Sequence, residues 1–467
     1  MWSPTLQLSP TPRYLALAEA IETDIAAGRL KGGDQLPTHR DLARQLKVTI
    51  GTITRGYREA QKRGLITGEV GRGSFVREQS ARSVRLTWNR GDVGSGAIEL
   101  SQNFPVPLPE IEQRVLAPIV RDLAGDMPSV ISAPWPALLS HHQHIGVRWL
   151  ERYGVTATPQ RVLISTGFQS ALWAIVSALC NAGDAILADQ LATPGLLTLA
   201  GALNVRVAGV ACDEHGILPA ALQRAIDEHE PRLLYLTPTI HTPTTTLMPA
   251  SRRREIAAIA AEGNLRIIED DDNWPLLDAR GSEAAGLPTF TSLADDRTFL
   301  IADVSRALGL GLRLSYVLCP EASLDETAGA LTGTTWMPAP LVAEIVARLI
   351  EGGGAQTIID ARRVELAARH ALAQQLLPAN RIDSHPAGHH LWLRLPEEWR
   401  SESFAAAAHK RGVLVNAAAT FAVNRAMSPG AVRICIGSPR TREELERGLR
   451  IIAGLLAQRP DHAGMVV

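Results

Sequence analysis

Lysine is scarce in this sequence: it occurs only as Lys31, Lys47, Lys62 and Lys410, against 43 arginines. No lysine lies between Lys62 and Lys410, so this long stretch cannot form a Schiff base through a lysine amine. The bias towards arginine also explains any single arginine without a functional role. An arginine in this chain therefore indicates a site only when the residues around it support one.

Paired cysteines and long apolar runs are also missing. The four cysteines are scattered and form no close pair, which indicates small core residues in a reducing compartment rather than a disulfide framework. The longest apolar runs, such as residues 171–180, are too short to span a bilayer. No basic-then-apolar signal sequence follows Met1. These absences predict a cytoplasmic protein with no membrane partner.

The overall composition is that of a soluble globular protein. The chain has 467 residues, 46% hydrophobic and 20% charged, enough for two or three domains. Its net charge of −1 is unevenly distributed: residues 1–80 carry 12 basic and 8 acidic residues (+4), and the remainder carries 35 and 40 (−5). The basic front part favours an anionic partner for that region.

Residues 10–78 carry the pattern of three short helices followed by a hairpin. Apolar Ala18 and Ile21 recur at helical spacing in the first segment, and Thr38 and Thr49 are good N-caps for the next two. The stretch "LITGEVGRGSFV" then alternates around a glycine-rich tip, as two paired strands do. The sequence therefore predicts a winged helix-turn-helix.

This region resembles the DNA-binding domain of GntR-type bacterial regulators. The matching motifs are "LPTHRDLA", the "VTIGT" start of the third helix and the "GRGSFV" wing. The resemblance implies that double-stranded operator DNA meets the start of the third helix and the wing. Ile50 departs from the pattern, because many relatives carry arginine there. The predicted DNA-binding residues are Arg40, Thr49, Thr52, Arg55, Arg72, Gly73 and Ser74.

Residues 79–97 lack periodicity and are predicted to be a linker, and residues 98–460 form the body. Apolar runs in the body alternate with helical patterns, which predicts an α/β fold with a mostly parallel, seven-stranded sheet covered on both faces. A smaller α+β domain follows, mainly over 341–460. The predicted strands are 162–165, 185–188, 205–210, 232–237, 265–269, 298–302 and 313–318.

The layout of the body, and the motifs on it, resemble fold-type I aminotransferases, which depend on pyridoxal 5′-phosphate (PLP). A GntR head joined to such a body is the combination found in MocR regulators, so the resemblance covers essentially the whole chain. Members of that family sense PLP or its amino-acid adducts and usually bind DNA as homodimers. The resemblance therefore implies operator DNA, a small-molecule effector and a second copy of the chain as partners.

The resemblance also assigns roles to residues of the body. Thr166, Gly167 and Phe168 follow a strand and open a helix, where the family seats the PLP phosphate on backbone N–H groups. Asp270 matches the carboxylate that faces the pyridine nitrogen. Arg313 matches the arginine that grips the phosphate, and Arg433 the one that grips the substrate carboxylate.

Other positions depart from the family. Ser305 matches, but Arg306 stands where relatives carry the Schiff-base lysine, and an arginine cannot serve as the amine nucleophile. Asp303 replaces a serine or threonine that bonds the phosphate, and its charge would repel it. Thr193 and Asp272 replace tyrosines at the cofactor ring. We therefore expect no catalytic residues and PLP binding that is non-covalent if it occurs.

Two hypotheses follow from Arg306. In the first, its guanidinium pairs with Asp272 or Asp303 and fills part of the former cofactor site. In the second, Arg306, Arg313 and Arg433 together hold a dicarboxylate or a phosphorylated metabolite. For the "HHQH" stretch at 141–144, the sequence shows no cysteine or acid at ligand spacing, so we expect a solvated helix face and no metal.

The sequence as a whole predicts a DNA-binding transcription regulator of MocR type with a catalytically inactive, effector-sensing body. The alternative is a PLP-dependent aminotransferase-like enzyme that carries a DNA-binding domain, which fails at Arg306. A third possibility is a body that senses protein partners; an effector-dependent change in operator affinity would argue against it.

Overall fold

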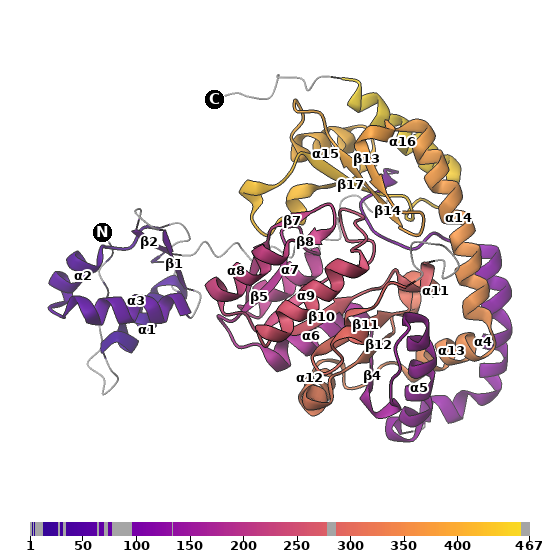
Figure 1. Ribbon diagram of the computed structural model, residues 1–467, viewed down its shortest axis with the longest axis horizontal. Coiled ribbons are helices and arrows are strands. Elements are labelled where there is room, and N and C mark those ends of the chain that lie inside the picture. Colours follow the sequence, from indigo (N-terminus) through magenta and orange to yellow (C-terminus); the bar gives the residue numbers. More distant parts are fainter. Residues whose placement is uncertain are drawn as a thin grey trace. The chain divides into compact units, whose positions relative to one another are not determined.

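The structure is a computed structural model of the chain (Figure 1). It describes residues 2, 4, 13–26, 29–30, 34–62, 65–69, 73–76, 96–132, 134–277 and 286–458. The chain divides into two compact units: a head made mainly of Met1–Arg85, and a body that holds most of the remainder. Most of the predicted linker, 79–95, lies outside the described residues.

The head contains the predicted three helices and hairpin. Its elements are α1 (Arg13–Ala26), α2 (His39–Leu46), α3 (Ile50–Lys62), β1 (Ile66–Glu69) and β2 (Gly73–Val76). Both predicted caps are confirmed: the Thr38 hydroxyl accepts from the Asp41 N–H, and the Thr49 hydroxyl accepts from the Thr52 N–H, each at 3.2 Å. The two strands pair antiparallel as the wing.

A small apolar core holds the head together. Leu17 and Ile21 of α1 are buried against Ile53 and Tyr57 of α3. The two helices approach closely at Gly56, where an added Cβ would lie 2.7 Å from Leu17 Cδ2. The Tyr57 hydroxyl donates to the Pro37 carbonyl at 2.8 Å. These contacts orient α3 and leave its outer face to solvent.

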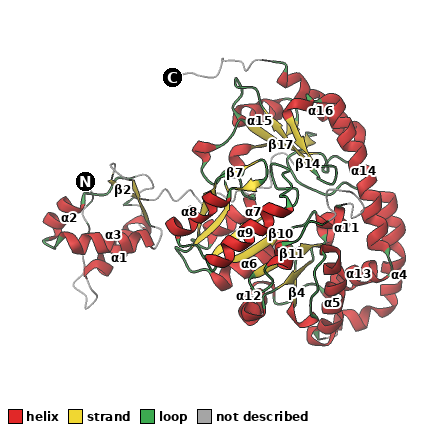
Figure 2. Cartoon of the chain, viewed as in Figure 1, coloured by secondary structure: helices red, strands yellow, loops and turns green. Residues whose placement is uncertain are grey.

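The body is built on a seven-stranded sheet whose order is β4-β12-β11-β10-β9-β5-β6, as predicted in number and class. Its pairs β9–β10, β10–β11 and β5–β9 are parallel, and β12 pairs antiparallel with both β11 and β4. Every residue of β5 and β9 is buried, because helices surround the sheet (Figure 2). The strands are β4 (Val162–Ser165), β5 (Ala185–Asp189), β6 (Arg206–Val210), β9 (Leu233–Leu236), β10 (Arg266–Asp270), β11 (Thr298–Asp303) and β12 (Ser315–Leu318).

The smaller domain has a four-stranded antiparallel sheet of order β13-β14-β17-β16. Its strands are β13 (Ile382–Ser384), β14 (His390–Arg394), β16 (Asn416–Ala417) and β17 (Ala431–Cys435). Two short ribbons complete the strands: β3 (Ile98–Glu99) with β15 (Val413–Leu414), and β7 (Cys212–Asp213) with β8 (Gly216–Ile217).

Thirteen α-helices are described in the body. They are α4 (Pro109–Ser132), α5 (Trp135–Leu150), α6 (Phe168–Leu179), α7 (Pro194–Ala202), α8 (Pro219–His229), α9 (Ala250–Glu262), α10 (Phe290–Leu293), α11 (Ser305–Leu308), α12 (Leu324–Thr335), α13 (Pro340–Glu351), α14 (Gly354–Leu376), α15 (Ser401–Lys410) and α16 (Arg442–Leu456). Among the described residues, no helix is both long and apolar enough to cross a membrane.

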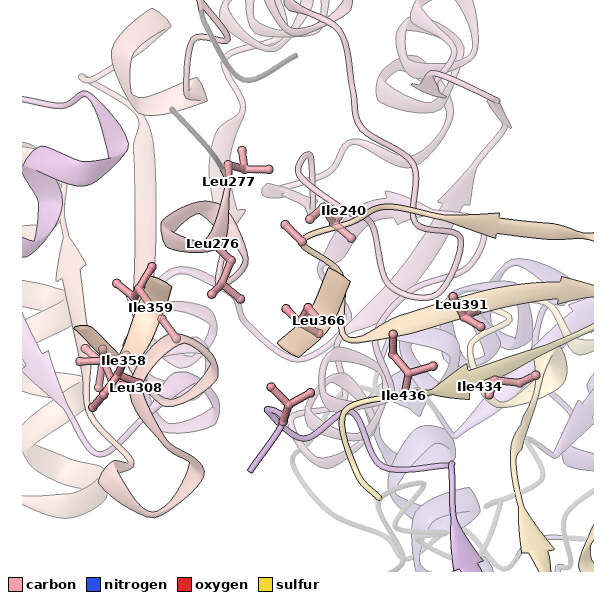
Figure 3. Packing of buried hydrophobic residues seen from close by; sticks show 14 of the residues in the cluster. Ile240, Leu276, Leu277, Leu308, Ile358, Ile359, Leu366, Leu391, Ile434 and Ile436 are labelled. Carbon is pink, nitrogen blue, oxygen red and sulfur yellow. The ribbon is translucent and has the colours of Figure 1, made fainter. Parts of the chain in front are cut away.

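One apolar core joins the two parts of the body. Leu308 of α11 packs against Ile358 and Ile359 of α14, and the same cluster continues to Leu391 and Ile434 of the small sheet (Figure 3). The long helix α14 thus ties the loop after β11 to the small domain. Because that loop carries Arg306, the core fixes the position of the site described next.

Candidate functional site

The exposed end of α3 forms the candidate DNA interface. Thr49 and Thr52 stand at its N-terminus with their hydroxyls 2.9 Å apart. Arg40 on α2 and Arg55 on α3 are exposed, and neither forms an ion pair with a described residue. A helix N-terminus with short polar side chains and free arginines suits the major groove and its phosphates.

The wing adds two further predicted residues. Gly73 is exposed with φ +117°, a conformation that side chains rarely adopt, and Ser74 is half-buried. The Ser74 carbonyl accepts from the Leu36 N–H at 2.8 Å, which fixes the wing to the chain before α2. Arg72 lies outside the described residues. Ile50, the departure from the family pattern, is 50% exposed at the start of α3.

In the body, Asp303 dominates the turn predicted to seat a phosphate. Its Oδ2 accepts from the Phe168 N–H at 3.0 Å and from the Ser315 hydroxyl at 2.6 Å, and its Oδ1 accepts from the Ser305 N–H at 2.7 Å. Asp303 is 4% exposed. The carboxylate thus takes the backbone donor at the start of α6, where the helix dipole favours an anion.

Sheet register explains how Asp303 reaches this turn. Asp303 ends β11 opposite Ser315 of β12, and Ser315 lies opposite Ser165 of β4. The three residues therefore stand side by side, and β4 leads directly into the turn at Thr166 and Gly167. Beyond the expected repulsion of a phosphate, the Asp303 carboxylate therefore takes up one backbone donor of the predicted phosphate site, the Phe168 N–H.

Arg306 pairs with Asp272, so the ion pair expected in the first hypothesis is confirmed for one of its two carboxylates. Arg306 Nε lies 2.7 Å from Asp272 Oδ2, and its Nη1 donates to the Asn103 carbonyl. Burial alone would lower the pKa of Arg306, but the charges of Asp272, Asp270 and Asp303 raise it above its usual value. The guanidinium is therefore a fixed, fully charged structural group.

Asp270 also has a partner within the protein. Its Oδ2 accepts from the Tyr235 hydroxyl, which lies 3.1 Å from the Thr193 hydroxyl. Burial and the nearby charge of Asp272 raise the pKa of Asp270 well above its usual value. The two carboxylates at the end of β10 are thus held by Tyr235 and by Arg306.

The remaining predicted arginines differ in exposure. Arg313 is exposed with φ +30°, and its guanidinium lies against Gly167, where an added Cβ would be 3.1 Å from Nη2. Arg433 is 6% exposed; its Nη2 donates to the Ser101 carbonyl at 2.7 Å, and its guanidinium lies 4.7 Å from the Phe421 ring centroid. No described carboxylate pairs with either arginine.

Sequence reasoning missed two buried histidines beside these arginines. His389 precedes β14 and His390 is its first residue, and both are fully buried. Burial and the positive charges of Arg306 and its neighbours lower the pKa of both well below the usual value, so both are neutral. The "GHHLW" stretch was a visible signal, but only the fold brings it next to Arg306.

The prediction for residues 141–144 was wrong at His142. His141 and His144 are exposed, but His142 is 1% exposed, and burial lowers its pKa to about 4. An acid does lie nearby: Glu344 of α13 is 4.0 Å from His142 Nε2, and with His141 these groups are close enough to hold an ion. Glu344 is already paired with Arg348 at 2.8 Å.

Comparison with protein families matches both units. Residues 13–76 match bacterial regulatory proteins of the gntR family, and residues 136–452 match aminotransferase class I and II. A solved archaeal alanine:glyoxylate aminotransferase shares the fold of the body, with a TM-score of 0.70 and 19% identity over 81% of this chain and 97% of that one. The expected fold-type I aminotransferase-like body is therefore confirmed.

Full-length relatives combine the two units. The HTH-type transcriptional regulator YdeF of Bacillus subtilis is 30% identical, covering 97% of this chain and 96% of its own. The vitamin B6 salvage pathway transcriptional repressor PtsJ of Salmonella typhimurium is 27% identical, covering 87% and 90%. This chain thus belongs to the MocR-type regulators of the GntR family, in which a winged helix-turn-helix is fused to an aminotransferase-like body.

Proposed function

We propose that this protein is a sequence-specific DNA-binding transcription regulator whose body senses a small molecule without forming a Schiff base. The observation that carries the DNA-binding part is the exposed start of α3, flanked by unpaired Arg40 and Arg55. The alternative, a PLP-dependent enzyme, finds no support at Arg306. An arginine cannot form the Schiff base, and this guanidinium is paired with Asp272.

DNA binding can be tested without knowing the operator. The full chain would select duplexes from a randomised pool, and binding of the selected duplex would be measured by gel mobility at two salt concentrations. We expect a defined sequence, together with affinity that falls as salt rises, since phosphate contacts release counterions. Binding with no sequence preference, or none at all, would contradict the proposal.

We further propose that the functional units are those of the sequence analysis: a head over 10–78, a linker over 79–97 and a body over 98–460. A second copy of the chain would place two heads on two half-sites of the operator. Sedimentation of the free protein and of its complex with DNA would measure this. Two chains per selected duplex are expected, and a single chain bound per duplex would contradict it.

The residues of the body do not fit PLP as a covalent cofactor. The Asp303 carboxylate accepts the Phe168 N–H that a phosphate would use, and its negative charge would repel a phosphate bound there. Arg306 and Asp272 occupy the region where the family has its lysine and a ring tyrosine. The only lysine of the body, Lys410, is exposed at the end of α15. Any PLP binding would be non-covalent and weak.

Anionic groups of an effector still have candidate partners. Arg433 is buried without a described carboxylate partner, and Arg313 is exposed beside the Gly167 turn. A carboxylate at Arg433 would satisfy a buried charge that now has one backbone acceptor and one aromatic face. The second hypothesis, with Arg306 as a third ligand, is weakened because Arg306 already has an acidic partner.

A PLP titration followed by calorimetry and visible absorbance tests these points. We expect the wild type, and Arg306→Lys alone, to show no absorbance band of a Schiff base, since Asp303 still holds the seat. The triple variant Arg306→Lys, Asp303→Ser, Asp272→Tyr should show the band. A band in the wild type would overturn the proposal, because a lysine outside the site would then be reaching it.

A further inference from the structure

A cavity lies in the body, apart from the residues predicted to bind a cofactor. It has a volume of about 700 Å³ and lies between the ends of β5 and β9 and the edge of the small sheet at β13 and β14. None of the predicted cofactor residues lines it. Its volume is in the range of pockets that hold small ligands.

Asp189, the last residue of β5, lines this cavity as a buried carboxylate without a strong cationic partner. Its side chain is 10% exposed. Its Oδ1 accepts a weak hydrogen bond from the Cys212 thiol at 3.3 Å, and His241 Nε2 is 3.8 Å away. Within the described part of the chain, no arginine or lysine pairs with Asp189. Burying a charged carboxylate without a cationic partner costs free energy, which a bound cation would offset.

The rest of the lining leaves the negative charge uncompensated. Asp213 is paired with Arg252 at 2.9 Å and Asp383 with Arg394 at 3.1 Å, so these two carboxylates are neutralised. Glu214 is an exposed carboxylate on the lining and forms no ion pair with a described residue. The net field in the cavity therefore favours a cation.

Neutral groups complete a site for an ammonium. Thr237, Thr244 and, from the small sheet, Trp392 are among the residues that line the cavity, and threonine hydroxyls can accept hydrogen bonds. An aromatic face attracts a cation at short range. Burial and the Asp189 charge raise the pKa of Cys212, so its sulfur remains a thiol donor and not a second anion.

We propose that this cavity binds a small organic cation with a primary ammonium group, with Asp189 as its counter-ion. The proposal rests on the proposed function, in that such a molecule would be an effector. The cavity also adjoins the cofactor region: Gln190 and Leu191 line it, and Thr193 is bonded to Tyr235 there. Ala192 N–H donates to the Phe421 carbonyl at 2.8 Å, which fixes this segment to the small domain.

The experiment uses the full-length protein and a panel of probes: butylamine, 1,4-diaminobutane and 1,5-diaminopentane, with 1-butanol and 1,4-butanediol as neutral counterparts. Calorimetry would measure binding to the wild type, to Asp189→Asn and to Asp227→Asn, an exposed α8 residue outside the cavity. Asparagine keeps the shape of the side chain and its acceptor for Cys212, so folding is expected to survive; thermal unfolding would check it.

We expect at least one amine to bind the wild type and Asp227→Asn equally, at least 10-fold weaker binding to Asp189→Asn, and no binding of the alcohols. The proposal is overturned if no amine binds, or if Asp189→Asn binds as well as the wild type. Operator affinity would be measured separately. Amine binding in a protein that fails to bind DNA would refute the regulator function and leave the cavity assignment standing.

Discussion

The head and the cofactor region use their charges in opposite ways. In the head, Arg40 and Arg55 are exposed and have no described ionic partner. In the cofactor region, Arg306 is bound by Asp272, and Asp303 holds the N–H groups of two turns. The head therefore has charge available for an external partner, whereas these charges of the body are already satisfied within the chain.

Burial explains this difference. An exposed arginine is solvated and costs nothing to leave unpaired, so it can wait for a phosphate. A buried charge must be matched inside the protein, and matching it removes a site that a ligand could use. Residues that frame a cofactor site can thus be present while their charges are already matched within the chain.

The largest effect on stability should come from breaking the ion pair between Arg306 and Asp272. Asp272→Ala leaves the Arg306 guanidinium largely buried without its counter-ion, and we expect a loss of about 3 kcal/mol in the free energy of unfolding. Chemical denaturation would measure it. The double variant Asp272→Leu, Arg306→Met should lose clearly less, because both charges are gone; an equal loss would show that the pair itself is not the cause.

Acid should weaken the body and spare the head. Burial lowers the pKa of His142 and His370 to about 4 in the folded state, whereas an unfolded histidine titrates at about 6.5. The unfolded chain binds more protons between these values, so stability is full above about pH 6.5 and falls as the pH drops towards 4. Each histidine should account for about 2 kcal/mol between pH 7 and pH 5.

Denaturation curves at the two pH values would check this loss. His142→Gln and His370→Gln should each flatten the pH dependence, since glutamine does not titrate. The head contributes little, because His39 is the only histidine in residues 1–85. A pH dependence unchanged in both variants would assign the effect to other titrating groups, such as His389, His390 or carboxylates.

In the head, removing a charged side chain should affect DNA binding and not stability. Arg55→Ala removes an exposed, unpaired side chain, so the free energy of unfolding should change by less than about 0.5 kcal/mol. Affinity for the selected operator should fall about 10-fold, the loss expected for one base or phosphate contact. Arg58→Ala, also exposed on α3, is the matched control, and an equal loss there would indicate only general charge attraction.

The smallest effect should come from an exposed ion pair in the body. Arg450 and Glu446 are 2.6 Å apart on α16 but 64% and 39% exposed. Arg450→Ala should cost about 0.3 kcal/mol, since solvent screens such a pair. Comparing the losses of unfolding free energy in Arg450→Ala and Asp272→Ala would show whether burial or the number of contacts decides how much an ion pair stabilises the fold. A loss as large as that of Asp272→Ala would refute the explanation by burial.

Much of the fold was predictable because it depends on local patterns. The caps at Thr38 and Thr49, the wing and all seven strands of the large sheet follow from spacing and apolar runs along the chain. The prediction at His142 was wrong, because its burial depends on α13, which is some 200 residues away in the sequence. Periodicity within one segment could not reveal that neighbour.

The sequence by itself determined the family, the missing lysine and the set of departures at Asp303, Asp272 and Thr193. Only the tertiary structure decided which partner each one takes. Asp303 lies beside Phe168 because β11, β12 and β4 are adjacent, and Arg306 takes Asp272 because the ends of β10 and β11 meet at one edge of the sheet. Residue identity sets the charge that is present, but sheet order sets the distance between charges, and that distance decides whether a charge is satisfied or free.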